Sequence, residues 1–137
     1  MRRSLPVLLV LAACQGDAPP NLLLELEGHW TGSFGSDEGS VPASAHFTWS
    51  DDDEALQGEL TLSEPEGDRA FTVLDAASVE ELGVSLGLVE EAGVRELYLD
   101  ALVPLAPYQG AWRQEWYCGE GELGFCELSG GFLLVLR

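Results

Sequence analysis

The sequence predicts an all-β protein, an antiparallel up-and-down meander that closes, or nearly closes, into a barrel of about eight or nine strands. Apolar and polar residues alternate along many short segments, and breaks rich in Gly, Pro, Ser and Asp separate these segments. Such alternation at short, regular intervals is typical of antiparallel sheets with one face on a core. Apolar residues make up 46% of the 137 residues, which is enough for one modest core.

The expected strands follow from this alternation, taken in chain order. In segment 56–62, Leu56, Leu60 and Leu62 fall on one face and Gln57 and Glu59 on the other. The same alternation predicts strands at 29–34, 46–50, 56–62, 70–74, 83–89, 95–103, 111–117, 122–128 and 132–137. These segments therefore predict about nine short strands.

The breaks between the strands predict how they connect. Segments 50–55, 63–69 and 90–93 are hairpin-sized, which favours pairing of strands in sequence order. A meander of this kind can remove its exposed edges by closing into a barrel, and a β-sandwich is the alternative. The only helix candidate is 78–83, where Ser78 and Glu81 match a capping box; it is at most a turn or two long, and strand is the alternative.

The first residues have the layout of an export signal. Residues 1–3 carry two arginines, residues 5–11 are apolar apart from one proline, and Ala12 and Ala13 precede Cys14. The apolar run is too short to cross a membrane, which takes about 20 residues. An exported chain is therefore expected.

The last four residues of this segment, Leu11-Ala12-Ala13-Cys14, resemble the lipobox of bacterial lipoproteins. The resemblance implies cleavage before Cys14 and lipidation (palmitate among the acyl chains) of that cysteine. It divides the chain into a signal peptide (1–13), an acylated cysteine with a short linker (14–21) and a single all-β domain (22–137). Because Gln15 follows the cysteine, the resemblance also implies anchoring to the outer membrane of the cell envelope. An ordinary secretory signal with a chance cysteine is the alternative.

Two cysteines remain once Cys14 is assigned to the anchor. Cys118 and Cys126 flank a Gly-rich turn between two expected strands, and export favours a disulfide between them. Zinc would need further ligands, and no histidine is near in the sequence. No metal site and no cofactor is expected.

The segment GHWTGSF, with Gly28, Trp30 and Gly32, resembles the Gly-x-Trp motif that opens lipocalin-like and avidin-like meander barrels. The last ten residues, 128–137, resemble the final strand of small bacterial barrel lipoproteins. The resemblance implies a barrel architecture of the calycin type and leaves the ligand open.

Several large aromatic residues are candidates for contacts with a small apolar ligand inside the barrel. The candidates are Trp30, Trp49, Tyr98, Trp112 and Trp116. Tryptophan offers an apolar body with one hydrogen-bond donor, but the same residues would also fill a packed core. Trp112 and Trp116 share a face with Gln114, which makes that face mixed.

Charge limits the classes of partner. Without the signal, four arginines stand against 24 acidic residues, a formal charge of −20. Such a chain is unsuited to nucleic acid, and only its lipid anchor would hold it at a membrane. A cationic protein is the kind of partner that this charge would attract, and residues 117–122 resemble a segment of small acidic lipoproteins that inhibit lysozyme.

No motif indicates an enzyme. His29 and His46 lie outside any catalytic motif, no serine sits in a Gly-x-Ser-x-Gly elbow, and the acidic run from Asp51 fails the EF-hand pattern. The sequence therefore predicts a membrane-anchored bacterial lipoprotein whose acidic barrel is a binding or structural module. An inhibitor of a cationic hydrolase such as lysozyme is the alternative.

Overall fold

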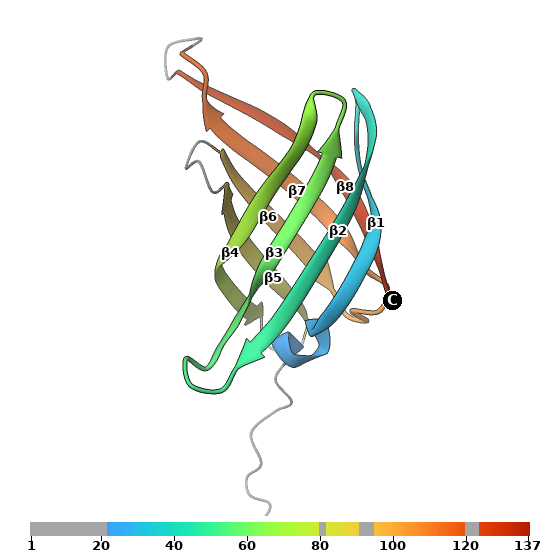
Figure 1. Cartoon of the computed structure of the whole chain (residues 1–137), viewed down its shortest axis with the longest axis vertical. Helices are drawn as coiled ribbons and strands as arrows, with labels where there is room; N and C mark the ends of the chain where they lie inside the picture. Colours follow the sequence, from blue (N-terminus) through green and yellow to red (C-terminus); the bar gives the residue numbers. More distant parts are fainter. Residues whose placement is uncertain (1–21, 80–81, 91–94, 120–123) are drawn as a thin grey trace, which may run out of the picture.

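Eight antiparallel strands close into a barrel in the computed structural model, which describes residues 22–79, 82–90, 95–119 and 124–137 (Figure 1). A short 3-10 helix, η1 (Leu22–Leu26), precedes the strands, which are β1 (Gly28–Ser36), β2 (Gly39–Ser50), β3 (Ala55–Glu64), β4 (Gly67–Val79), β5 (Gly83–Glu90), β6 (Arg95–Leu102), β7 (Tyr108–Tyr117) and β8 (Phe125–Leu136). Each strand pairs with the next one, and β8 returns to pair with β1. The predicted meander and its closure into a barrel are confirmed, and the sandwich alternative is excluded.

Two sequence predictions about the elements are corrected. The expected strands 122–128 and 132–137 are, in their described part, the single strand β8, because its pairing with β7 is unbroken from Phe125 to Leu134. The barrel therefore has eight strands rather than nine. The helix at 78–83 is also not found where the structure describes this segment, and the strand alternative holds there, since Ser78 and Val79 pair with β5 and extend β4. Ladder hydrogen bonds with a neighbouring strand outweigh a local capping signal of this length.

Two hairpins at the end of the barrel opposite η1 are tight. Ser36 pairs with Gly39 around a two-residue turn, and Glu64 pairs with Gly67 in the same way. Gly39 and Gly67 have φ values of 122° and 136°, a region that side chains disfavour and glycine accepts. The sequence thus places a glycine where each returning strand begins.

The opposite end is closed by η1, which Figure 1 shows beneath the barrel. Leu22, Leu23 and Leu26 are buried there, and the Trp30 Nε1 group donates a hydrogen bond to the Leu26 carbonyl at 2.8 Å. The carboxylate of Glu27 accepts a hydrogen bond from the Trp49 backbone N–H, also at 2.8 Å. We call this the closed end.

Aromatic side chains fill the interior from the closed end upward. Trp30 contacts Tyr108 edge-on at 6.0 Å between ring centroids, and Tyr108 contacts Phe132 at 5.0 Å. Phe34 then continues the series, 5.3 Å from Phe132 and 5.9 Å from Trp112. Leucines from β3, β5 and β6 pack around them, so the lower part of the barrel is a solid core.

Candidate functional site

A cavity of about 570 Å³ occupies the other end of the barrel, between the β1–β2, β3–β4 and β7–β8 connections. Its size is within the range of small-molecule sites, which span about 300–1,000 Å³. We call this the open end. The cavity is the continuation of the barrel interior beyond the point where the aromatic core stops.

The lower wall of the cavity is apolar. Phe34, Leu62, Trp112 and Leu128 line it. The indole of Trp112 lies across β8, where its Nε1 group donates a hydrogen bond to the Gly35 carbonyl at 2.9 Å. Gly130 makes this possible, because a Cβ atom there would overlap that carbonyl oxygen and lie 3.0 Å from the indole nitrogen.

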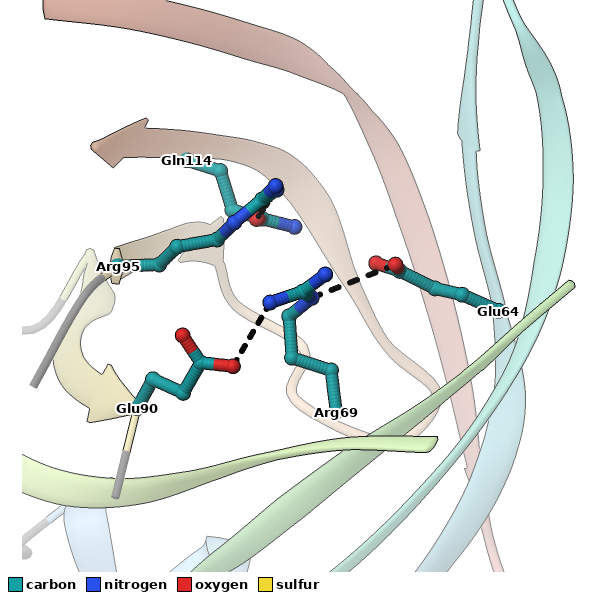
Figure 2. Close-up of polar contacts among 5 residues, drawn as sticks. All are labelled: Glu64, Arg69, Glu90, Arg95 and Gln114. Carbon is teal, nitrogen blue, oxygen red and sulfur yellow. Dashed lines mark hydrogen bonds and ion pairs between the residues drawn. The ribbon is translucent and has the colours of Figure 1, made fainter. Parts of the chain in front are cut away.

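Charged side chains lie inside the barrel at the level of the cavity (Figure 2). The Arg69 guanidinium of β4 contacts the carboxylate of Glu64 at 3.3 Å and that of Glu90 at 2.8 Å. Desolvation disfavours the charged form of Arg69, but the attraction of Glu64 and the hydrogen bond to Glu90 outweigh it and raise the pKa of Arg69. Arg69 is therefore held between two carboxylates.

A second arginine, Arg95 of β6, is held differently. Its Nη1 group donates a hydrogen bond to the Gln114 side-chain oxygen at 3.0 Å, and its guanidinium stacks on the Trp116 ring at 4.0 Å from the centroid. Among the described residues, no carboxylate lies within 4.0 Å of it. Desolvation and the repulsion of Arg69 lower the pKa of Arg95. A negatively charged hydrogen-bond acceptor in the cavity would offset both the desolvation of Arg95 and its repulsion by Arg69.

Gln114 is the buried polar residue of the described core, with 2% of its surface exposed. Its oxygen is engaged by Arg95, and the side chain lines the cavity, so its amide N–H groups complete a donor surface with the Arg95 guanidinium. Figure 2 shows the two side chains pointing toward each other from neighbouring strands. This pair, with the stacked Trp116, is the polar centre of the candidate site.

The five predicted interior aromatics are placed in three different environments. Trp112 and Trp116 line the cavity. Trp30 is fully buried in the core near the closed end, and Trp49 packs against that core, so neither reaches the cavity. Tyr98 corrects the prediction, because it lies on the outer face, hydrogen-bonded to Glu96.

The predicted disulfide is confirmed. Cys118 and Cys126 are bonded across the β7–β8 hairpin, with their Cα atoms 5.9 Å apart, and Cys126 borders the cavity. The bond joins the residue that follows β7 to Cys126 of β8, the residue that pairs with Trp116. The predicted signal peptide, the predicted lipidation site at Cys14 and the predicted linker all fall within residues 1–21, which lie outside the described residues.

The charged residues of the site were not among the residues predicted from the sequence. Each occupies an inward position of its strand: Glu64 follows the phase of Leu62, Arg69 that of Phe71, Glu90 that of Leu88 and Arg95 that of Leu97. A charged residue two positions from an inward apolar residue of the same strand is therefore the signal that would have identified them. Only Gln114 was noted on such a mixed face.

Among the described residues, no three His, Cys, Asp or Glu side chains gather in a way that would hold a metal ion. His29 and His46 stack on each other at 3.9 Å on the outer face. No helix within the described ranges has the length and apolarity needed to span a membrane.

Comparison of the chain with protein-family models, with curated proteins and with solved structures found no match. What the candidate site does therefore has to follow from its own geometry.

Proposed function

We propose that this protein is an envelope lipoprotein that binds a small molecule in the open end of its barrel. The observation that carries the proposal is the buried donor pair of Arg95 and Gln114, which faces a cavity of about 570 Å³. Apolar side chains around a few convergent polar groups are the usual composition of a small-molecule site. Because the cavity combines this polar centre with apolar walls, the expected ligand is amphipathic. The sequence had led us to expect a purely apolar ligand.

Stability alone gives little reason for this cluster. Charges inside a protein are costly to desolvate, and apolar replacements of similar volume are often neutral or stabilising. Yet two of the four arginines outside the signal segment, Arg69 and Arg95, point into the barrel. A binding role supplies the reason that stability does not.

The described chain begins at the end of the barrel opposite the cavity. Leu22, where the described chain begins, is buried at the closed end, and the cavity opens at the other end. A lipid on Cys14 would therefore hold the closed end near the membrane and direct the open end away from it. Substituting Cys14→Ala tests the anchor separately, with loss of the protein from the membrane fraction as the expected result.

The binding proposal is tested with a panel of small acids, bases, zwitterions and neutral compounds, by measuring the melting temperature of the full-length protein. A ligand that binds only the folded state raises that temperature. Val41→Trp fills the cavity that Val41 lines, and Val135→Trp places the same side chain on the exposed outer face of β8 as the control.

We expect compounds that stabilise the wild type and the Val135→Trp variant but not the Val41→Trp variant. A panel without any stabilising compound contradicts the proposal. Equal stabilisation of both variants does so too, because the ligand would then bind elsewhere.

A further inference from the structure

The two sides of the cavity differ in their chemistry. On one side, β6 and β7 present the Arg95 guanidinium and the Gln114 amide, both hydrogen-bond donors. Strands β2 and β3 lie half-way round the ring of eight strands from β6 and β7. The turns that begin β2 and end β3 carry carboxylates to the rim of the cavity on that opposite side.

The carboxylates of this acidic side are Glu38, in the β1–β2 turn, and Glu66, in the β3–β4 turn. Both residues are exposed, and neither side chain has an ion-pair or hydrogen-bond partner among the described residues. Glu64, below Glu66, differs because Arg69 already contacts it. Glu66 attracts Arg95 without contacting it, so a cation at the rim would break no ion-pair contact.

The donor side is the buried one and fixes the orientation. An arginine edge with an adjacent amide matches the two oxygens of a carboxylate, and charge-assisted hydrogen bonds of this kind are about twice as strong as neutral ones. Trp116 holds the guanidinium by stacking on its face, which leaves its edges for hydrogen bonds. A carboxylate is therefore the group that the buried side selects.

Long-range electrostatics then opposes a simple anion. The whole chain has a formal charge of −18, and Glu38 and Glu66 stand at the entrance that an anion must pass. Salt screens the repulsion between charges that lie farther apart than a Debye length, which is about 8 Å at physiological ionic strength. The rim carboxylates belong to the cavity itself, so salt screens their repulsion of an entering anion much less. A ligand without net charge avoids this repulsion, and a cationic group on it gains attraction at the rim.

On the basis of the proposed function, we infer that the ligand is a small zwitterion: its carboxylate binds Arg95 and Gln114, and its ammonium group faces Glu38 and Glu66. The aliphatic body between the two groups lies on the apolar wall of Leu62 and Leu128. Amino acids with separated charges and short peptides belong to this class.

The test compares probes with the same carbon skeleton. Binding of ω-aminoalkanoates of four to eight carbons to the full-length protein is measured by calorimetry, beside the alkanoate, the alkylamine and the ω-aminoalkanamide of each length. We expect one aminoalkanoate length to bind about threefold to fivefold more tightly than its alkanoate, which lacks the ammonium group, and at least tenfold more tightly than the alkylamine and the amide, which lack the carboxylate.

Two sets of variants separate the two sides of the cavity. Arg95→Gln is expected to weaken the aminoalkanoate and the alkanoate by about tenfold to a hundredfold, the range of a charge-assisted hydrogen bond. Arg113→Gln is its matched control, since Arg113 stacks on Tyr98 in a similar way but on the outer face. The control is expected to leave binding unchanged.

Glu38→Gln combined with Glu66→Gln is expected to weaken the aminoalkanoate by about threefold to fivefold, the size of an exposed ion pair, and to leave alkanoate binding equal or stronger. Asp51→Asn with Asp52→Asn removes the same charge from the β2–β3 turn at the closed end and serves as the control. Because the Glu38 and Glu66 side chains are exposed, these variants are expected to fold.

The outcomes distinguish the inference from the function on which it rests. Equal binding of the alkanoate and the aminoalkanoate, or an equal loss of both in the Glu38/Glu66 variant, overturns the zwitterion and leaves a carboxylate site. Binding of other compounds in a manner that Val41→Trp abolishes, with no response to any aminoalkanoate, also overturns the zwitterion but keeps the binding function. If no compound of any class binds in the cavity, both proposals fail.

Discussion

The two ends of the barrel are built from the same eight strands but are held together in different ways. At the closed end, η1 and the aromatic series from Trp30 to Phe34 fill the interior of the barrel. At the open end, the inward positions carry Arg69, Arg95 and Gln114 around a cavity. Packing supplies the stability of one end, while ion pairs and a disulfide shape the other.

This division explains why one small domain can carry a costly polar cluster. The closed end buries enough apolar surface to keep the fold, so the open end is able to hold charges that a packed core would exclude. Equivalent substitutions at the two ends test this division, and we expect the packed end to respond most strongly.

The largest difference is expected between two leucine truncations. Leu99→Ala, in the closed part of the core, removes a side chain with 0% exposure and should lower the free energy of unfolding by about 3–5 kcal/mol. Leu128→Ala borders the cavity, leaves no new enclosed void and should cost about 1 kcal/mol. Urea unfolding measures both, and equal losses would contradict the division between the ends.

Removal of the disulfide is expected to have the next largest effect. Cys118 and Cys126 are eight residues apart, and a loop of this length corresponds to about 2–3 kcal/mol on the chain-entropy model. The Cys118→Ser, Cys126→Ser double variant should lose this amount in urea unfolding, and the wild type should match it when reduced. A loss below about 0.5 kcal/mol would show that the open end does not depend on this link.

The ion pairs of Arg69 should contribute less. Arg69→Met leaves the carboxylates of Glu64 and Glu90 without their cation, and these side chains keep 17% and 13% of their surface exposed. Solvent screening reduces the penalty of a fully buried charge, so we expect a loss of about 1–2 kcal/mol. Arg113→Met, on the outer face, is the control and should change the unfolding free energy by less than about 0.5 kcal/mol. Equal effects would mean that the inner cluster is as solvated as the surface.

The smallest effect concerns Tyr108, which is fully buried near the closed end with a hydroxyl that has no partner among the described residues. Tyr108→Phe removes this unpaired group and is expected to be neutral or to stabilise by up to about 1 kcal/mol at pH 7. Urea unfolding again gives the value. A loss above about 1 kcal/mol would show that the hydroxyl is satisfied.

Alkaline pH sharpens this last test. Burial raises the pKa of Tyr108 above its ordinary value of 10.0, so the folded state keeps a proton that the unfolded state releases. The stability linked to Tyr108 is therefore complete below pH 10 and is lost progressively as the pH rises above it. The wild type should lose stability more steeply than Tyr108→Phe in this range, and parallel curves would contradict the burial of a neutral phenol.

Much of the architecture could be predicted because it depends on properties local to the chain. Alternation in segments such as 56–62 identified the strands, and the disulfide followed from the sequence around Cys118 and Cys126. The errors arose where local signals competed with pairing. The expected strands 122–128 and 132–137 leave a gap at Gly130 and Gly131, but both glycines continue β8, and Ser78, at the start of the helix candidate, extends β4.

The candidate site was predicted only in part. Trp112, Trp116 and the mixed face with Gln114 were visible as a pattern within one strand. Arg69 and Arg95 were not recognised, because a single inward charge in a strand has no meaning until its neighbours across the barrel are known. Tyr98 was misplaced for the related reason that its aromatic character outweighed its outward phase.

By itself, the sequence determined the strands, their order of pairing through short hairpins, the acidic surface and the cysteine pair, all of which depend on neighbours close in the chain. The tertiary structure alone decided that the barrel closes with eight strands, that one end is packed and that the other is hollow. It also decided which charges meet, since Glu64, Arg69, Glu90 and Arg95 come from four strands. Their contacts depend on closure and register, and these are set by the summed pairing and packing of the whole barrel rather than by any one segment.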